Sequence, residues 1–285
     1  LIALFLLVML YNALFAQQTL LQSGPMVGYS QMTEVAIWIQ TKSQANVQAA
    51  FWEKDHPEIV QKTEVVTTNP SSTFTAKLFF RNLQPGKRYQ YEVFINQQRL
   101  VFPYETSFQT LPLWQYRYDA PDFSFALGSC AYVNEPELDR PGNPYGGDMQ
   151  IFKHIVEQKP DMMLWLGDNV YLREADWNAQ SGIEHRYTHT RSLPELQALL
   201  AGTHHYAIWD DHDFGPNDSD RGFFGKYQTL EAFENFWVNP GFGKPNEADG
   251  IFCRFQWNDV DFFLLDNRFE RTPNNRNTGA NTILG

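Results

Sequence analysis

The chain has 285 residues, of which 43% are hydrophobic, 15% aromatic and 19% charged, and its formal net charge is −11. This is the composition of a globular protein, and the length suffices for one large domain or two ordinary ones. The negative charge and the lack of any Lys/Arg cluster in the sequence argue against nucleic-acid binding, because a phosphate backbone is bound by clustered cations.

The first sixteen residues, LIALFLLVMLYNALFA, contain an unbroken apolar run from Leu1 to Leu10. The run is short for a transmembrane helix, but it is typical of the apolar region of a secretory signal, with Ala16 before a cleavage point. An initiator Met and a basic leader do not precede it, so residues 1–16 are expected to be the remnant of a signal peptide. The alternative is a buried N-terminal strand or helix. The signal predicts a secreted or periplasmic protein with no stable membrane span after cleavage.

Residues 17–112 are predicted to form a β-sandwich of the immunoglobulin or fibronectin type. Short segments with apolar residues at every second position are separated by turn formers such as Pro85-Gly86. The Lys, Glu and Gln residues between the apolar ones are expected on solvated faces. The expected strands are VAIWIQ (35–40), VQAAFW (47–52), TEVVTT (63–68), FTAKLFF (74–80) and RYQYEVFI (88–95).

The pattern changes after a proline-containing linker at 111–122, and residues 113–285 are predicted to form an α/β domain. Apolar strands, the first of them expected to be buried, now alternate with segments of helical periodicity. Ser192 is the expected cap of the second helix, and the last two strands are expected to form a hairpin that turns at Asn258-Asp259. The expected strands are 123–129, 161–168, 205–211 and 261–268, and the expected helices are 147–158, 192–202 and 227–237.

Three of these strands end in residues able to bind a metal. In open α/β sheets, ligands bind beyond the carboxyl ends of the strands, so the three ends are expected to converge on one patch. Oxygen donors suit hard cations, whereas a thiolate or an imidazole suits iron or zinc, so a mixed set indicates two unlike metals. The ends are Gly128-Ser129-Cys130, then Gly167-Asp168-Asn169 with Tyr171 beyond, and Asp210-Asp211-His212-Asp213.

Each of these signals also has a purely structural interpretation. Cys130 alone is more often a core residue than a ligand, and it could instead form a disulfide with Cys253. Asp210 could cap a following turn, and Asp213 could be an ordinary surface residue. The ordered combination is more specific, because carboxylates clustered at a buried strand are costly unless cations compensate them.

The segments GSCAY (128–132), LWLGDNVY (164–171) and WDDHDFGPND (209–218) together resemble the alkaline phosphatase D (PhoD-like) family of metallophosphoesterases. VAIWIQT and LQPGKRYQYEVF resemble the N-terminal domain of that family, and LLDNRFER (264–271) resembles a later segment. The resemblance implies a β-sandwich followed by a metallophosphoesterase α/β sandwich. It also implies a secreted enzyme that hydrolyses phosphate monoesters and diesters with iron (Fe3+) and calcium (Ca2+).

The resemblance implies roles for individual residues as well. Cys130, Asp168 and Tyr171 would bind the iron, with Asp168 bridging to the calcium. The remaining assignments are Asn217 as the calcium-binding asparagine, Asp210 as a further metal ligand, and Asp211 and His212 as catalytic residues that support the ligands or position the substrate.

One part of the family pattern does not occur here. No His-x-His or Gly-Asp-x-His segment follows Asp266, although the superfamily takes its last metal ligands from such a segment. The α/β domain is therefore expected to be incomplete and the chain to be a fragment, whose activity alone is in doubt. The expected substrate is a small-molecule, lipid or polymer phosphoester. A rival hypothesis is a non-catalytic secreted binding module that keeps the fold.

Other polar residues are weaker candidates for the site. Adjacent His204 and His205 are expected to face opposite sides of a strand, which disfavours a shared metal. The segment from His185 to Arg191 would form only a weak helix, so a surface or substrate loop is expected there. Arg186 or Arg191 could contact phosphate, but exposed ion pairs are expected for them. Arg268 follows the last strand and could reach the site.

Overall fold

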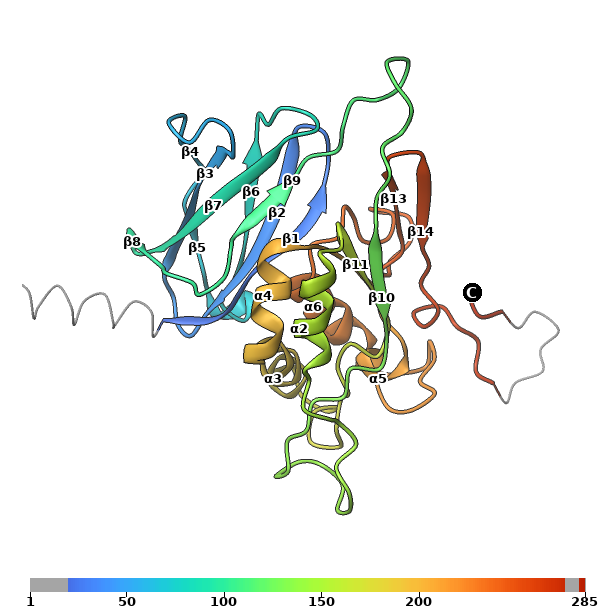
Figure 1. Cartoon of the computed structure of the whole chain (residues 1–285). Coiled ribbons are helices and arrows are strands. Elements are labelled where there is room, and N and C mark those ends of the chain that lie inside the picture. The colour runs from blue at the N-terminus through green and yellow to red at the C-terminus, as the bar shows by residue number, and fades with distance from the viewer. Residues whose placement is uncertain (1–19, 275–281, 285) are drawn as a thin grey trace, which may run out of the picture.

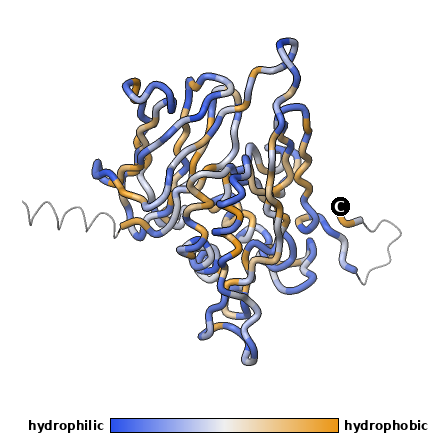
Figure 2. Tube along the Cα trace, in the orientation of Figure 1, coloured by the Kyte–Doolittle hydropathy of each residue, from blue (hydrophilic) through white to orange (hydrophobic). Residues whose placement is uncertain are grey.

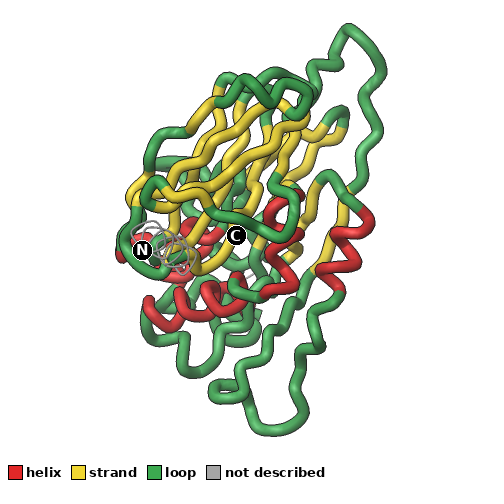
Figure 3. Tube along the Cα trace, turned by 60° about the vertical axis from the view of Figure 1, so that its left-hand side comes forward, coloured by secondary structure: helices red, strands yellow, loops and turns green. Residues whose placement is uncertain are grey.

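The computed structural model describes residues 20–274 and 282–284, so the predicted signal remnant at residues 1–16 lies outside the described residues. In Figure 1 the N-terminal strands occupy the upper left, the helices the centre and the C-terminal hairpin the right. Figure 3 shows the helices below and beside the strands, and Figure 2 shows hydrophobic segments mostly in the interior. No helix in the described part of the chain is long and apolar enough to span a membrane.

The N-terminal part forms two antiparallel sheets packed as a β-sandwich, as predicted. One sheet has the order β1-β2-β6, and the other has the order β4-β3-β7-β8, with β5 paired to β3 and β9 to β7. Phe80 of the first sheet contacts Phe51 and Phe108 of the second, with ring centroids 4.8 and 4.7 Å apart. The strands are β1 (Leu21–Ser30), β2 (Glu34–Thr41), β3 (Asn46–Glu53), β4 (Gln61–Lys62), β5 (Val66–Thr67), β6 (Thr75–Arg81), β7 (Arg88–Ile95), β8 (Gln98–Arg99) and β9 (Ser107–Gln109), with a short 3-10 helix at Pro70–Ser72.

The sandwich differs from the prediction in the segment 63–68, and the strands β1, β4, β8 and β9 were not predicted. The segment 63–68 is mostly irregular and contains only the two-residue β5. Its threonine hydroxyls take the place of ladder bonds, because Thr63 accepts from the N–H of Ala49 (3.0 Å) and Thr68 from that of Ala45 (2.9 Å). Strand β1 was not predicted, because its Gly and Pro residues and its register shifts against β2 hide the alternating pattern.

The described residues from 123 onward form a parallel sheet of order β10-β11-β12, five helices and the hairpin predicted at Asn258-Asp259. The predicted strands and helices are found, with ends that differ from the predicted ones by up to four residues, and α3 and α5 were not among the predicted elements. The elements are β10 (Phe125–Gly128), α2 (Ile151–Gln158), β11 (Met162–Leu166), α3 (Gln180–Arg191), α4 (Pro194–Gly202), β12 (His204–Ile208), α5 (Asp211–Phe214), α6 (Lys226–Phe236), β13 (Cys253–Trp257) and β14 (Val260–Leu264).

Strand β2 is buried on both faces, so the prediction of a solvated face is wrong for this strand. Ile37 and Ile39 lie in the sandwich core, whereas Ala36 and Trp38 lie in the core of the α/β part. Gln40 is also buried, and its Nε2 donates to a threonine hydroxyl of α3 (2.9 Å). The two parts of the chain therefore share a hydrophobic interior across this sheet.

Strand β10 was expected to be buried, and this prediction is wrong. It pairs with β11 at the edge of the parallel sheet. Phe125 and Leu127 are 43% and 60% exposed. An apolar run of this length does not distinguish a central strand from an edge strand, because position in the sheet depends on which other strands pair with it.

Helix α3 is regular, contrary to the weak helix or loop expected for this segment. Arg186 and Arg191 are 0% and 4% exposed, so the prediction of exposed ion pairs is also wrong. Arg186 pairs with Asp176 (2.9 Å), and the guanidinium carbon of Arg191 lies 3.8 Å from the ring centroid of Trp237. These tertiary contacts stabilise a helix whose threonines and histidines have low intrinsic helix propensity.

Helix α4 begins at Pro194 with Leu193 at its N-cap, so the prediction that Ser192 caps it is wrong. Ser192 instead ends α3, where its hydroxyl donates to the carbonyl oxygen of Thr188 (2.6 Å). A proline in the first turn has no N–H to satisfy, which lets the helix begin without a side-chain cap.

His204 and His205 lie on opposite faces of β12, as predicted, and both rings are used in hydrogen bonds. Burial lowers the pKa of His204 to about 4 and that of His205 to about 3. Neither ring retains a nitrogen for a metal. The ring of His204 bonds to the carbonyl oxygen of Gly28 (2.8 Å) and the backbone N–H of Gln109 (3.2 Å). The ring of His205 bonds to the indole N–H of Trp165 (2.8 Å) and the carbonyl oxygen of Leu199 (3.1 Å).

We predict that these two histidines make the fold sensitive to acid. Both are neutral when folded, but on unfolding they regain the ordinary histidine pKa of about 6.5. The unfolded state then binds more protons, so their contribution is fully present above pH 6.5 and falls as the pH drops toward 4. Each histidine should lower the unfolding free energy by about 2 kcal/mol between pH 7 and pH 5.

Urea unfolding at these two pH values tests the prediction. The amide of a His205→Gln variant can accept from Trp165 and donate to Leu199, so the variant should lose less stability between pH 7 and pH 5 than the original chain. An equal loss in the two proteins would contradict the prediction.

Candidate metal centre

The carboxyl ends of β10, β11 and β12 lie side by side, because these strands are parallel neighbours. The last residue of β10, Gly128, pairs with Trp165, and the last residue of β11, Leu166, pairs with Ile208. The loops that follow therefore begin at one edge of the sheet, where ligands of α/β proteins usually bind. These loops carry Cys130, Asp168, Tyr171 and the segment from Asp210 to Asn217.

The structure brings five of the predicted site residues together. Asp168, Asp211 and His212 each offer one ligand atom, and these atoms lie within 4.8 Å of one another, so the group could hold a metal ion. The Sγ of Cys130 lies 3.8 Å from Oδ2 of Asp168. The ring centroids of Tyr171 and His212 are 4.5 Å apart. The backbone N–H of His212 donates to Oδ1 of Asp168 (3.3 Å), which joins two of the loops directly.

The backbone at two of these positions is left-handed. Cys130 has φ = 61° and Asp168 has φ = 52°, a region that costs most non-glycine residues of order 1 kcal/mol or more. Gly167, with φ = 97°, comes so close to the next loop that a Cβ would lie 2.7 Å from the Cβ of Asp210. The chain thus holds unfavourable conformations at the strand ends, as is common at functional sites.

The donor set at the strand ends fits a metal. Burial is the largest cause of the raised pKa of Asp168. The interaction with His212 lowers this pKa, and the interaction with Asp211 raises it. Burial likewise raises the pKa of the Tyr171 phenol, and hydrogen bonding to Cys130 and Asp168 adds to the rise. A cation among these groups would stabilise their anionic forms and offset the desolvation. Thiol and phenol donors beside carboxylates match a transition metal paired with a harder cation.

Asp213 is fully buried and ties the loops together, so the surface position considered for it is wrong. Its Oδ1 accepts from the N–H groups of Asn169 (3.0 Å) and Val170 (3.2 Å), and its Oδ2 accepts from that of Asp210 (3.0 Å). Burial raises the pKa of Asp213 to about 8, against the effect of these hydrogen bonds. Asp213 therefore fixes the loop after β11 against the loop after β12.

Asp210 lies outside the group formed by Asp168, Asp211 and His212, and it pairs with Arg268. The guanidinium Nη2 of Arg268 is 2.5 Å from Oδ1 of Asp210 and 3.8 Å from Oδ1 of Asp211. Asp210 also stands at the N-cap of α5, as its structural interpretation anticipated. A metal role for Asp210 stays a prediction, and Arg268 does reach the site.

Asn217 is exposed and lines a cleft of about 750 Å³ beside the group. Its Nδ2 donates to the adjacent carboxylate of Asp218 (3.0 Å). The cleft lies within the size range of small-molecule sites, roughly 300–1,000 Å³. Its lining includes Cys130, Tyr171 and His212 from the group, together with Tyr132, Arg140, Tyr145 and Trp177 from the surrounding loops.

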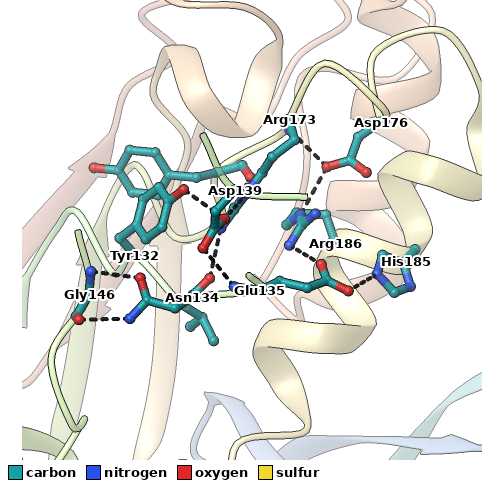
Figure 4. Close-up of polar contacts among 11 residues, drawn as sticks. Tyr132, Asn134, Glu135, Asp139, Gly146, Arg173, Asp176, His185 and Arg186 are labelled. Carbon is teal, nitrogen blue, oxygen red and sulfur yellow. Dashed lines mark hydrogen bonds and ion pairs between the residues drawn. The ribbon is translucent and has the colours of Figure 1, made fainter. Parts of the chain in front are cut away.

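Polar contacts shape the loop between β10 and α2, and one of them joins it to the loop after β11, as Figure 4 shows. Asp139 accepts from the Nη2 of Arg173 (2.7 Å) and from the hydroxyl of Tyr132 (2.9 Å). The side chain of Asn134 donates to the carbonyl oxygen of Gly146 (2.7 Å) and accepts from its N–H (3.0 Å). This wall of the cleft is therefore built in advance of any ligand.

Tyr145 and Trp177 were not predicted as site residues, because neither belongs to one of the motifs. Tyr132 falls within the motif GSCAY (128–132), two residues after Cys130, but it was not predicted as a site residue either. Cys130 and Cys253 are both free, so the disulfide considered for them is not formed. Cys130 is exposed, and its interpretation as a core residue is therefore wrong.

Comparison with known families gives two matches. A family model described as "PhoD-like phosphatase" matches residues 125–284. A model described as "Domain of unknown function (DUF7800)" matches residues 18–113. A comparison with curated proteins found no match.

One solved structure, described as "Structure of PhoD", superposes with a TM-score of 0.74 at 18% identity and covers 93% of this chain. This chain spans 57% of that chain's length, and at this identity the likeness establishes the fold. Two smaller domains also match. The sensor domain of the anti-sigma factor RsgI4 in Pseudobacteroides cellulosolvens has 18% identity and a TM-score of 0.26, and the match covers 33% of this chain and 94% of that one. An fn3 domain of human contactin 1 has 19% identity and a TM-score of 0.25, and the match covers 34% of this chain and 84% of that one.

Proposed function

Because the chain belongs to the PhoD-like phosphatase family, we propose that it is a metal-dependent phosphoesterase that hydrolyses phosphate monoesters and diesters. The observation that carries the proposal is the group formed by Asp168, Asp211 and His212 at the ends of parallel strands, beside a cleft large enough for an ester substituent. Family membership confirms the resemblance inferred from three short motifs.

The proposed ligands follow from the chemistry of the donors. Cys130 and Tyr171 would hold iron together with Asp168, because a thiolate and a phenolate match the charge of Fe3+. Asp168 and Asn217, with Asp210 as a further candidate, would hold calcium through oxygen atoms. When bound, the two metals would supply positive charge that polarises a phosphoryl oxygen and lowers the pKa of water.

Asp211 and His212 are proposed to position the substrate. Asp211 is held by the backbone N–H of Asp218 (2.6 Å) and faces Arg268 at 3.8 Å, so its carboxylate has a defined orientation. His212 belongs to the candidate metal group and also lines the cleft, so its imidazole lies where the metal group and the cleft meet. Groups held in this way would lose little entropy on binding a phosphoryl group.

Export of the protein is a further part of the proposal, and it rests on the apolar run at residues 1–16. The proposed substrates are small-molecule, lipid or polymer phosphoesters. A cleft of about 750 Å³ is larger than one phosphoryl group and leaves room for a substituent.

The test is elemental analysis together with hydrolysis assays on the protein expressed with its natural termini. We expect near-stoichiometric iron and calcium, and hydrolysis of p-nitrophenyl phosphate and bis(p-nitrophenyl) phosphate. Chelation should lower both rates by at least about 100-fold, because the metals supply several kcal/mol of transition-state stabilisation, and adding the metals back should restore them. A protein with neither metal nor hydrolysis would overturn the proposal and favour the non-catalytic binding module.

A further inference from the structure

A row of aromatic rings runs from the candidate metal group along the cleft. Ring centroids are 4.5 Å apart for His212 and Tyr171, 4.8 Å for Tyr171 and Tyr132, and 5.2 Å for Tyr132 and Tyr145. Successive rings are tilted by 30° to 53°, an ordinary geometry for aromatic contacts. All four rings line the same cleft, and the indole of Trp177 adds a fifth.

The outer part of this row is held in place. The hydroxyl of Tyr132 donates to Asp139 (2.9 Å), and the guanidinium carbon of Arg173 lies 4.3 Å from the Tyr132 ring centroid. Gly146, directly after Tyr145, approaches so closely that a Cβ there would lie 2.1 Å from the carbonyl oxygen of Tyr132. Tyr145 is nevertheless 69% exposed. An exposed ring that packs against the half-buried Tyr132 provides apolar contact area for a ligand.

The charges along the cleft are already paired. Arg140 lies 2.7 Å from Glu174 at the exposed rim, and Arg173 lies 2.7 Å from the half-buried Asp139. These pairs leave little charge to attract a second anionic group. The lining therefore suits an uncharged substituent, and its ring faces suit a flat one.

We propose that the three tyrosines of this row, Tyr132, Tyr145 and Tyr171, form together with Trp177 a subsite for a flat ring substituent carried by the phosphoester substrate. The proposal rests on the proposed function, because it takes the phosphoryl group to lie at the strand ends. A ring attached to phosphorus through one or a few bonds would enter the cleft from that point. The preferred substrates are thus aryl or heteroaryl phosphoesters, and plain alkyl esters are poorer ones.

Binding of phosphonates, which are not hydrolysed, tests the subsite without relying on turnover. We would measure the affinities of phenyl-, cyclohexyl- and methylphosphonate by calorimetry. Phenylphosphonate should bind about two- to tenfold more tightly than cyclohexylphosphonate, which is similar in size but not flat. In the Tyr145→Ala variant the ratio of phenyl to methyl affinity should fall by about the same factor, and Tyr145→Phe should restore it. Tyr116→Ala, at a fully exposed tyrosine of the linker, is the matched control.

The outcomes separate the subsite from the proposed function. Equal affinity for the phenyl and cyclohexyl compounds, or a ratio unchanged by Tyr145→Ala, overturns the subsite. If phosphoesters are still hydrolysed in that case, the proposed function stands. A protein that binds no phosphonate and hydrolyses no phosphoester overturns both.

Discussion

The Asp168→Asn variant is expected to lose phosphoester hydrolysis by at least about 10³-fold, more than the 10–100-fold that loss of an outer-shell partner costs. Asp168 is the proposed bridge between two metals, and it touches most of the other candidates. Its Oδ2 lies 3.8 Å from the Sγ of Cys130, and its Oδ1 accepts a hydrogen bond from the backbone N–H of His212. Asp168 also belongs with Asp211 to the candidate metal group. An amide cannot supply the negative charge that two cations require, so metal content should fall as well.

The same variant should fold as well as the original chain. Asparagine tolerates the left-handed backbone at φ = 52°, and its carbonyl oxygen can accept the N–H of His212. Removing a charge beside Asp211 also relieves repulsion in the metal-free protein. The unfolding free energy without metal should therefore change by no more than about 0.5 kcal/mol.

Measurements of kcat, metal content and melting temperature, each with and without added metal, check this prediction. The control is Asp259→Asn, which makes the same charge change in the exposed turn between β13 and β14. A protein with Asp168→Asn that kept its metals and more than a tenth of its rate would rule out the bridging role.

The convergence of Cys130, Asp168 and Asp211 could be predicted because it depends on a general property of parallel sheets. Each residue follows the end of an apolar strand by two or three positions, and the three strands turn out to be neighbours. The left-handed backbone of Cys130 and Asp168 could not be predicted, because neither is a glycine. Backbone hydrogen bonds between the two loops accompany that conformation, from the N–H of Cys130 to the carbonyl oxygen of Gly167 (3.2 Å) and from that of Ala131 to the carbonyl oxygen of Asp168 (2.9 Å).

The burial of polar residues was the main failure of the sequence-based predictions. A surface position was considered for Asp213, yet its Oδ1 accepts hydrogen bonds from backbone N–H groups of another loop. Arg186 pairs with Asp176 and with Glu135 of a distant loop, and no local pattern marks such partners. In both cases the deciding interaction lies far away in the sequence, where periodicity carries no information.

For strand β2, in contrast, the sequence pattern itself indicated burial on both faces. The intervening residues of VAIWIQ include Ala36 and Trp38, so its second face is nearly as apolar as its first. A strand with two apolar faces is typical of a sheet covered on both sides. The structure covers this strand with the sandwich core on one face and the α/β core on the other.

The Arg186→Met variant is expected to destabilise the fold by about 3–5 kcal/mol, the usual cost of removing one member of a buried ion pair. Arg186 is 0% exposed and lies 2.9 Å from Asp176 and 2.7 Å from Glu135 (Figure 4). Methionine fills a similar volume but leaves two carboxylates without their cation. Glu135 belongs to the loop that carries Tyr132 and Asp139, so the wall of the cleft should loosen with it.

Unfolding in urea at pH 7 measures this loss. Arg254→Gln is the matched control, because Arg254 and Asp261 form an exposed pair at 2.6 Å, and removing it should cost no more than about 1 kcal/mol. If Arg186→Met does not fold, Arg186→Lys provides the test. Lysine keeps the charge but cannot reach both carboxylates as the guanidinium fork does, so an intermediate loss is expected. Equal stability of the Arg186 and Arg254 variants would show that the buried network does not hold the loop.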